Sequence, residues 1–285
     1  MSSIKSEWPL VVFTTCAPLC AGAWIVAAFF AIFELSPQAD ALTSGLYGAV
    51  LCVLLVISLV CSTLHLGKPL RALRAFMRLG NSTVSNEVFM AFLFALSAVL
   101  YLLLSQILFL AGDICKMLLM FVTVFAALFV LFQCLAYRMR TVPTWNSFSF
   151  SIEFAVIALL SGICIEGLFA SLALPLSFDV RIVLVAIEAA CCAFMVLVVC
   201  LQGAVVAKSV ARCRNVNLGL GPLSLLSALR VLTIVVGSVV WSCGLLAYEP
   251  MVALMAIGAI LILCGIVIGR YAFYRFYMNV GLPRV

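Results

Sequence analysis

Charged residues are scarce in this sequence. Of its 285 residues, 9% are charged and 67% are hydrophobic, and the mean hydropathy is +1.34. A soluble domain has about a quarter of its residues charged and about half apolar. With so few charges, a soluble fold would expose large apolar surfaces to water. The composition therefore excludes a soluble globular protein and indicates an integral membrane protein that is a single transmembrane domain, 1–285, with no separate soluble domain.

Histidine is almost absent, because His65 is the single histidine of the chain. Membrane redox anchors that carry b-type haem need two axial histidines for each haem, since the imidazole nitrogen is the iron ligand. One histidine cannot supply that pair. We therefore expect no haem, and any electrons that this chain handles must pass to another subunit.

Closely spaced cysteine pairs are also absent. The chain has 13 cysteines but no C-x-x-C pair, so neither an iron–sulfur cluster nor a zinc site is indicated. A buried cysteine behaves as a small hydrophobic residue. Most of the cysteines lie inside apolar runs and are expected to be packing residues: Cys16, Cys20, Cys52, Cys134, Cys164, Cys191, Cys192, Cys200, Cys243 and Cys264. We expect no metal to be bound by this chain.

Long apolar runs, by contrast, fill the chain. A membrane-spanning helix needs about 20 apolar residues, and a spanning β-barrel would alternate polar and apolar residues, which these runs do not. The first run is longer than the apolar core of a signal peptide, so we expect it to be retained. We predict an all-α integral membrane protein, a bundle of about eight transmembrane helices with both termini on the same side. The expected spans are 9–33, 42–64, 87–111, 114–136, 148–172, 180–206, 230–247 and 252–271.

Two titratable residues flank the connection between the second and third spans. His65 follows the second span and Glu87 opens the third, so both are expected at one face of the membrane. A histidine beside a carboxylate supplies a proton acceptor near neutral pH. Alternatively, His65 is satisfied by a backbone carbonyl, and Glu87 is a first-turn acid behind a Ser85 or Asn86 cap. The residues alone leave both interpretations open.

Three arginines lie between these residues. Arg71, Arg74 and Arg78 recur at spacings of three and four, beside an apolar stripe in the same segment, 70–78. This pattern predicts a short amphipathic helix in the plane of the membrane interface. The arginines could equally contact lipid headgroups.

Four further ionisable residues lie inside or at the start of apolar runs. They are Glu153, Glu166, Glu188 and Arg230. Such residues are functional candidates by default. Glu166 is either a proton-path residue or a protonated, hydrogen-bonded packing residue. Arg230, at the expected start of its span, is predicted to extend its charge toward the interface.

Several motifs together carry a family resemblance. The most specific are His65-Leu66-Gly67-Lys68-Pro69 and Ser85-Asn86-Glu87, and further matching segments are 7–10, 13–14, 70–72, 78–81, 141–145, 269–270, 273–274 and 280–281. On these residues the chain resembles the membrane anchor subunit of dimethyl sulfoxide reductase. That subunit is one of the haem-free, quinol-oxidising anchors related to the membrane subunit of polysulfide reductase. Segments 92–139 and 155–219 match in hydropathy more than in motif.

The resemblance implies a specific role. Such anchors oxidise menaquinol near the membrane surface and pass two electrons to an iron–sulfur subunit. That subunit serves a molybdopterin catalytic subunit, which reduces an S-oxide or N-oxide. His65 and Glu87 would form the quinol site. Separately from the resemblance, we infer that Arg71, Arg74 and Arg78 orient this site or dock the partner. No activity is expected of the chain alone, and no nucleic acid is expected as a partner. The implied location is the bacterial inner membrane.

Two arguments disagree about which side of the membrane this site faces. The basic loops at 68–78, 138–140 and 208–214 share one side with the termini, which the positive-inside rule places in the cytoplasm. The resemblance implies that the catalytic partner is exported, so that the end of the bundle with His65 would face outward. We expect this outward orientation, because a basic surface that docks a partner could override the positive-inside rule.

Two other classes remain open. A secondary transporter would have as many spans, although no inverted repeat is visible, and a non-redox membrane scaffold would need no histidine–acid pair. Substitution of His65 separates the three classes, since it would abolish quinol oxidation, alter substrate uptake or change nothing.

Overall fold

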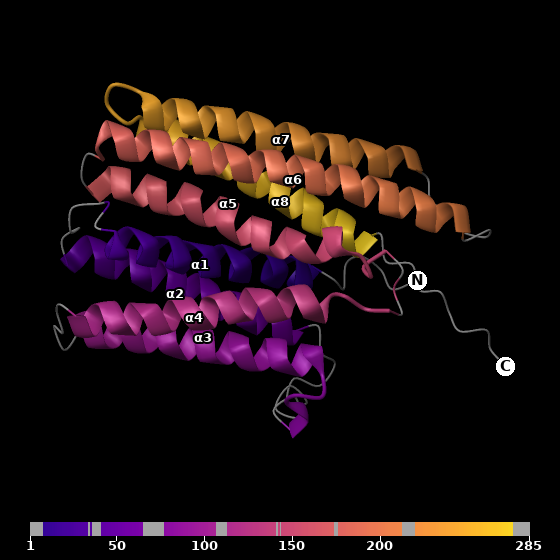
Figure 1. Ribbon diagram of the computed structural model, residues 1–285, viewed down its shortest axis with the longest axis horizontal. Helices are drawn as coiled ribbons and strands as arrows, with labels where there is room; N and C mark the ends of the chain where they lie inside the picture. The colour runs from indigo at the N-terminus through magenta and orange to yellow at the C-terminus, as the bar shows by residue number, and fades with distance from the viewer. Residues whose placement is uncertain are drawn as a thin grey trace.

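In the part of the chain that the structure describes, eight α-helices run side by side along one axis and alternate in direction (Figure 1). The computed structural model describes residues 8–33, 35, 41–64, 77–106, 113–140, 142, 144–173, 176–212 and 220–275. The helices are α1 (Trp8–Ile32), α2 (Ala41–Leu64), α3 (Thr83–Gln106), α4 (Asp113–Ala136), α5 (Phe148–Ala173), α6 (Phe178–Arg212), α7 (Leu220–Leu246) and α8 (Val252–Arg275). Each is long and apolar enough to cross a membrane, and the described residues contain no strand, so the all-α, eight-span prediction is confirmed.

Two helices begin earlier than the hydropathy suggested. α3 begins at Thr83 rather than at residue 87, and α7 begins at Leu220 rather than at residue 230. Gly221-Pro222 looked like a break in the sequence. Proline is nevertheless tolerated in the first turn of a helix, where the backbone N–H groups have no intrahelical acceptor. Arg230 therefore lies ten residues inside α7 and not at its start.

The bundle consists of two groups of four helices. α1–α4 surround one apolar core, which includes Phe94 and Phe129, and α5–α8 surround a second, which includes Trp241 and Met195. In Figure 1 the indigo-to-magenta group lies below the pink-to-yellow group. The main joint between the groups is the long contact of α1 with α5.

Glycines allow the α1–α5 joint to be unusually close. A Cβ atom on Gly22 would lie 1.7 Å from the carbonyl oxygen of Ala158, and one on Gly162 would lie 2.4 Å from the backbone of Gly22. α7 and α8 approach in the same way, since a Cβ on Gly258 would lie 2.5 Å from the backbone nitrogen of Trp241. Small residues at such crossings are typical of helix packing in membranes, where backbone approach and van der Waals contact drive association.

The outer faces of the helices are apolar. Large hydrophobic side chains such as Val53, Phe121, Leu197 and Ile260 are about half exposed along the helices. In water such a surface would be unstable, whereas lipid tails solvate it. The chain is therefore a multi-pass membrane protein.

One end of the bundle collects the start of α1, the end of α8 and the α2–α3, α4–α5 and α6–α7 connections, on the right in Figure 1. We call it the Trp8 end. The exposed basic residues Arg78, Arg138, Arg140 and Lys208 lie there. The Trp8 end is thus the basic face of the protein, as the loop sequences indicated.

Candidate functional site

Of the site residues predicted from sequence, the structure describes Glu87. His65, which follows the last residue of α2, lies outside the described residues, as do Arg71 and Arg74. The predicted amphipathic helix at 70–78 also falls outside them except for Met77 and Arg78, which are exposed in a short turn before α3. The roles of His65, Arg71 and Arg74 therefore stay predictions.

The turn before α3 fixes the position of Glu87. Gly80 has a φ of +80°, a left-handed conformation that favours glycine, and its N–H donates to Asn86 Oδ1 at 2.8 Å. Ser82 Oγ accepts the N–H of Ser85 at 3.4 Å and caps the helix. Hence the interpretation of Ser85 or Asn86 as the cap is wrong, and Glu87 is the fifth residue of α3. The helix dipole acts mainly within the first turn, so it does not account for Glu87.

Glu87 is buried at the Trp8 end and faces Gln133 of α4. The Glu87 side chain is 5% exposed and that of Gln133 is fully buried. By strict hydrogen-bond geometry, Glu87 Oε1 and both polar atoms of the Gln133 side chain have no partner within the described part of the chain, although the Gln133 amide is close enough to Glu87 to interact with its carboxyl. Buried polar atoms are almost always paired. Three such atoms in one place make this a candidate site for a polar ligand.

Two tyrosines lie next to this pair. The hydroxyls of Tyr137, just after α4, and Tyr274 in α8 are 3.1 Å apart, and Tyr274 reaches Thr14 Oγ1 of α1 at 3.5 Å. Both tyrosines interact electrostatically with Glu87. Polar side chains from α1, α3, α4 and α8 therefore meet at one place.

A buried ionic cluster continues from the tyrosines into the second group of helices. Arg230 of α7 and Arg270 of α8 both donate to Oε1 of Glu153 in α5. Gln202 of α6 donates to Glu153 Oε2 at 2.6 Å. The prediction that Arg230 extends toward the interface is wrong, because it is 4% exposed and its charge is neutralised inside the bundle by Glu153.

Arg270 is enclosed by aromatic rings. Its guanidinium carbon lies 4.3 Å from the ring centre of Phe154 and 5.0 Å from that of Phe273. Cation–π contacts of this kind stabilise a desolvated guanidinium. Sequence reasoning did not single out Arg270, Gln133 or the two tyrosines as site residues. An arginine inside the last apolar run was the available signal.

The other buried carboxyls lie elsewhere. Glu166 of α5 interacts with Tyr47 of α2. Glu188 of α6 accepts hydrogen bonds from Ser238 at 2.8 Å and Ser242 at 3.3 Å, both on α7. Each of them also has one carboxyl oxygen without a hydrogen-bond partner among the described residues, but neither lies at the Trp8 end, where Glu87 is the carboxyl with an open oxygen.

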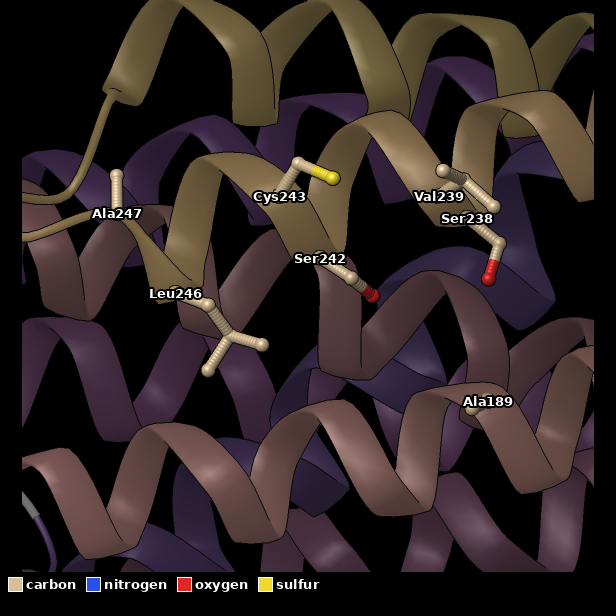
Figure 2. Close-up of a pocket in the computed structure, with 7 residues that line it drawn as sticks. All are labelled: Ala189, Ser238, Val239, Ser242, Cys243, Leu246 and Ala247. Atoms are coloured by element: carbon tan, nitrogen blue, oxygen red, sulfur yellow. The ribbon is translucent and has the colours of Figure 1, made fainter.

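A groove of about 480 Å³ lies between α6 and α7, in the other group of helices from Glu87. Figure 2 shows the hydroxyls of Ser238 and Ser242 directed from α7 toward α6. The remaining lining is small or apolar: Ala189, Val239, Cys243, Leu246 and Ala247. The Ser238 and Ser242 hydroxyls are engaged by Glu188, which leaves the groove with little chemistry of its own.

The described residues contain no group of three or more His, Cys, Asp or Glu side chains that could hold a metal ion. The polar groups described above at the Trp8 end are two carboxyls, two amides, two phenols and two guanidiniums. Such a set can bind hydroxyl groups and accept or donate protons.

Comparisons with known proteins agree with one another. The family model described as DMSO reductase anchor subunit (DmsC) matches residues 1–276. The protein is 30% identical to the YnfH subunit of anaerobic dimethyl sulfoxide reductase from Escherichia coli K12, over 97% of its own length and 96% of that subunit. It is also 30% identical to the C subunit of anaerobic dimethyl sulfoxide reductase from the same organism, over 99% of each sequence. A C subunit of the same description from Haemophilus influenzae matches at 28% identity, over 56% of this protein and 57% of that subunit. The chain belongs to the DMSO reductase anchor subunit family.

Proposed function

We propose that this anchor subunit of a DMSO reductase complex oxidises menaquinol at the Trp8 end of its bundle. The two electrons pass to an iron–sulfur subunit, which supplies a molybdopterin catalytic subunit. Family membership supports the anchor role, and the names of the similar proteins support a reductase that acts on dimethyl sulfoxide. The chain itself holds no haem, cluster or metal in this proposal and is inactive without its partners.

One observation carries the quinol site. Glu87 Oε1 and the Gln133 amide are buried at the Trp8 end of the bundle with open hydrogen-bonding positions. A quinol head needs acceptors for its two hydroxyl groups at the boundary, while its tail remains among the lipids. A pocket with apolar walls and a few placed polar groups meets this need. The Glu87–Gln133 pair would supply the polar groups of such a pocket, since both side chains are buried, one near the start of α3 and the other near the end of α4.

The chemistry follows from the groups present. Oxidation of a quinol releases two electrons and two protons and leaves a quinone. The Glu87 carboxylate accepts a hydrogen bond from one quinol hydroxyl and takes its proton, while the Gln133 amide orients the ring oxygen. His65 takes the second proton, and Arg71 and Arg74 orient the head group. A positioned base of this kind contributes about 10²–10⁴-fold to the rate of a proton transfer.

The exposed basic residues of the Trp8 end support the docking of the iron–sulfur subunit there. Arg78, Arg138, Arg140 and Lys208 are exposed and close to the end at which Glu87 lies. Electrostatic complementarity directs a partner to such a surface. We place the protein in the bacterial inner membrane with this end facing outward.

The test is quinol oxidation by the complex reconstituted in lipid, with variants Glu87→Gln and His65→Ala. Each is expected to lower kcat/KM for a menaquinol analogue by about 100-fold or more and to weaken the binding of a quinol-site inhibitor. Glu188→Gln is the buried control, since it changes a carboxyl in the other group of helices. Glu249→Gln is the exposed control from the α7–α8 connection. Assembly of the complex is checked for every variant by copurification.

Wild-type turnover in Glu87→Gln would contradict the site. Equal losses in Glu87→Gln and Glu188→Gln would also contradict it, because they would indicate a general effect of removing a buried carboxyl. Normal turnover in both Glu87→Gln and His65→Ala would leave the chain as an anchor that takes no part in quinol oxidation.

A further inference from the structure

The buried ionic cluster carries more positive than negative charge. Arg230 and Arg270 both donate to the carboxylate of Glu153, and all three side chains are buried. Within the described part of the chain, no other carboxylate forms an ion pair with either guanidinium, and Glu87, the other buried carboxyl of the Trp8 end, takes no part in these pairs. Two guanidiniums and one carboxylate leave one positive charge over inside the bundle.

The cost of that charge depends on what surrounds it. Burying a charge without a counter-ion is strongly unfavourable, because the low-dielectric interior does not replace the hydration that is lost. Neutral hydrogen bonds and aromatic rings lower this cost, but they carry no net charge and do not cancel the excess. A counter-ion is therefore expected next to one of the two arginines, and their contacts show which one.

Arg230 has little room for a further partner. Its Nη1 donates to Gln202 Oε1 at 3.2 Å, and its Nη2 lies 3.4 Å from the sulfur of Met195. Nε has no acceptor, but the backbone of α8 covers it, since a Cβ atom on Gly269 would lie 2.5 Å from both Nε and Cζ of Arg230. Each nitrogen of Arg230 is thus already in contact with the protein.

Arg270 differs from Arg230 because it has donors without acceptors. Its ion pair with Glu153 is made by Nη2. Nε and Nη1 are buried and have no hydrogen-bond partner in the described part of the chain. The rings of Phe154 and Phe273 lie against the guanidinium, with their centres 4.3 Å and 5.0 Å from Cζ. These N–H groups are therefore shielded from water but not neutralised.

The position of Arg270 favours an anion that comes from solution. Arg270 lies in the last turns of α8, at the Trp8 end, and the α4–α5 connection packs against this part of α8. Trp145 of the connection stacks on Phe273 with ring centres 4.6 Å apart and donates to the Phe273 carbonyl oxygen at 3.1 Å. The same connection carries the exposed Arg138 and Arg140. A basic surface of this kind raises the local concentration of anions.

We propose that Arg270 binds a small monovalent anion, chloride in ordinary solutions, at its Nε and Nη1 groups. The site goes beyond the proposed quinol oxidation and does not depend on it. One negative charge balances the two guanidiniums and the Glu153 carboxylate. A divalent anion such as sulfate would reverse the imbalance. A halide donates no hydrogen bond, so it suits a guanidinium edge that offers N–H groups alone.

The test is chloride NMR of the purified full-length chain in micelles of a neutral detergent. Chloride that exchanges with a protein site has a broadened line, and a single site gives an excess width that saturates. Sodium gluconate keeps the ionic strength constant, because its anion is too large for an enclosed site. Bromide should displace the excess width, and sulfate should displace it far less. A wild-type chain without a saturable excess width, or one from which sulfate displaces chloride as well as bromide does, would overturn the proposal.

Three arginine variants locate the site. In Arg270→Gln, which removes the donors and the excess charge, the saturable width should disappear. Arg181→Gln is the matched control, because Arg181 is also partly buried but donates to the carbonyl oxygens of Leu245 and Ala247 at the opposite end of the bundle. Arg140→Gln controls for the exposed basic surface. Both controls should keep the wild-type affinity. A width that persists in Arg270→Gln, or one that is lost in Arg140→Gln, would mean an adventitious ion only and would overturn the proposal.

Glu153→Gln is the sharpest variant, because here the proposal predicts a gain. Without the carboxylate the cluster has two positive charges, so chloride should bind about tenfold more tightly or better. Arg230→Gln changes the charge in the opposite direction and leaves the Arg270 donors in place, so chloride should bind about tenfold more weakly. Unchanged affinity in either variant would overturn the charge argument.

A further variant covers the case in which Arg270→Gln does not fold. Arg270→Lys keeps the positive charge but lacks Nε and the planar arrangement of N–H groups. It should weaken chloride binding by about tenfold and leave bromide and chloride equally affected. Wild-type affinity in Arg270→Lys would show that the Nε and Nη1 groups do not hold the anion, and the proposal would fail.

Discussion

Replacement of Glu153 by glutamine should be among the most damaging single substitutions in this protein. The Glu153 carboxylate is fully buried and receives Arg230, Arg270 and Gln202. Glutamine has nearly the same shape but no charge, so the packing of α5 would be kept. The substitution would leave two buried guanidiniums without a carboxylate. The lowered free energy of unfolding would then result from electrostatics and not from a cavity.

The size of the effect follows from the number of unpaired charges. Breaking a buried ion pair by removing one partner costs about 3–5 kcal/mol. We expect Glu153→Gln to lower the free energy of unfolding by about 4 kcal/mol on that scale. Glu188→Gln is the matched control, because Glu188 is also buried but accepts its hydrogen bonds, among the described residues, from the neutral hydroxyls of Ser238 and Ser242. It should cost about 1 kcal/mol, the value of a neutral hydrogen bond.

The assay is unfolding of the purified chain in mixed micelles by increasing SDS, followed by tryptophan fluorescence. Trp145 stacks on Phe273, the ring next to Arg270, with centroids 4.6 Å apart, so it reports on the cluster. Adding Arg270→Gln to Glu153→Gln removes one of the two unpaired charges and should recover about 2 kcal/mol. Equal losses for Glu153→Gln and Glu188→Gln, or no recovery in the double variant, would refute the electrostatic explanation.

Two further predictions concern glycines. Gly22→Val should cost about 3 kcal/mol or more, because even a Cβ at Gly22 would lie 1.7 Å from the Ala158 carbonyl oxygen and the α1–α5 joint would have to open; this is measured by the same SDS titration. Gly203→Val, where nothing lies within 4 Å of a Cβ, is the control and should change the midpoint little. Gly80→Ala should cost about 1 kcal/mol in stability, because residue 80 has a left-handed φ of +80°. A turn that relaxes to a negative φ loses the hydrogen bond from the residue 80 N–H to Asn86, which should weaken inhibitor binding at Glu87. A stable Gly22→Val protein, or a Gly80→Ala protein with wild-type stability, would contradict these reasons.

The number and type of the elements could be predicted from sequence because each span is set by its own run of apolar residues. A run of about 20 such residues is unstable in water and fills one crossing of the bilayer, whichever helices surround it. The ends of the helices were harder to predict. α3 starts after a cap at Ser82, and α7 starts two residues before Pro222. Both helix starts depend on the geometry of the preceding turn, which a hydropathy pattern does not reveal.

The candidate site stays a prediction, although the position of one of its residues could be checked. Glu87 was selected because a carboxylate beside an apolar run is rare and because its motif matched a family, and the structure places it, buried, at the expected end of the bundle. Its partners could not be found in the same way. Gln133 is an ordinary polar residue in the sequence, and Arg230 looked like an interfacial residue. Their roles depend on which helices are neighbours.

The sequence by itself determined that this is an eight-span membrane protein of the DMSO reductase anchor family, because composition, run length and motifs are local properties of the chain. Tertiary structure decided which buried charges meet. Glu153, Arg230 and Arg270 are separated by 77 and then 40 residues in sequence, yet they form one cluster because α5, α7 and α8 pack together. In a low-dielectric interior the energy of each charge depends on these distances, and only the packing of the helices sets them.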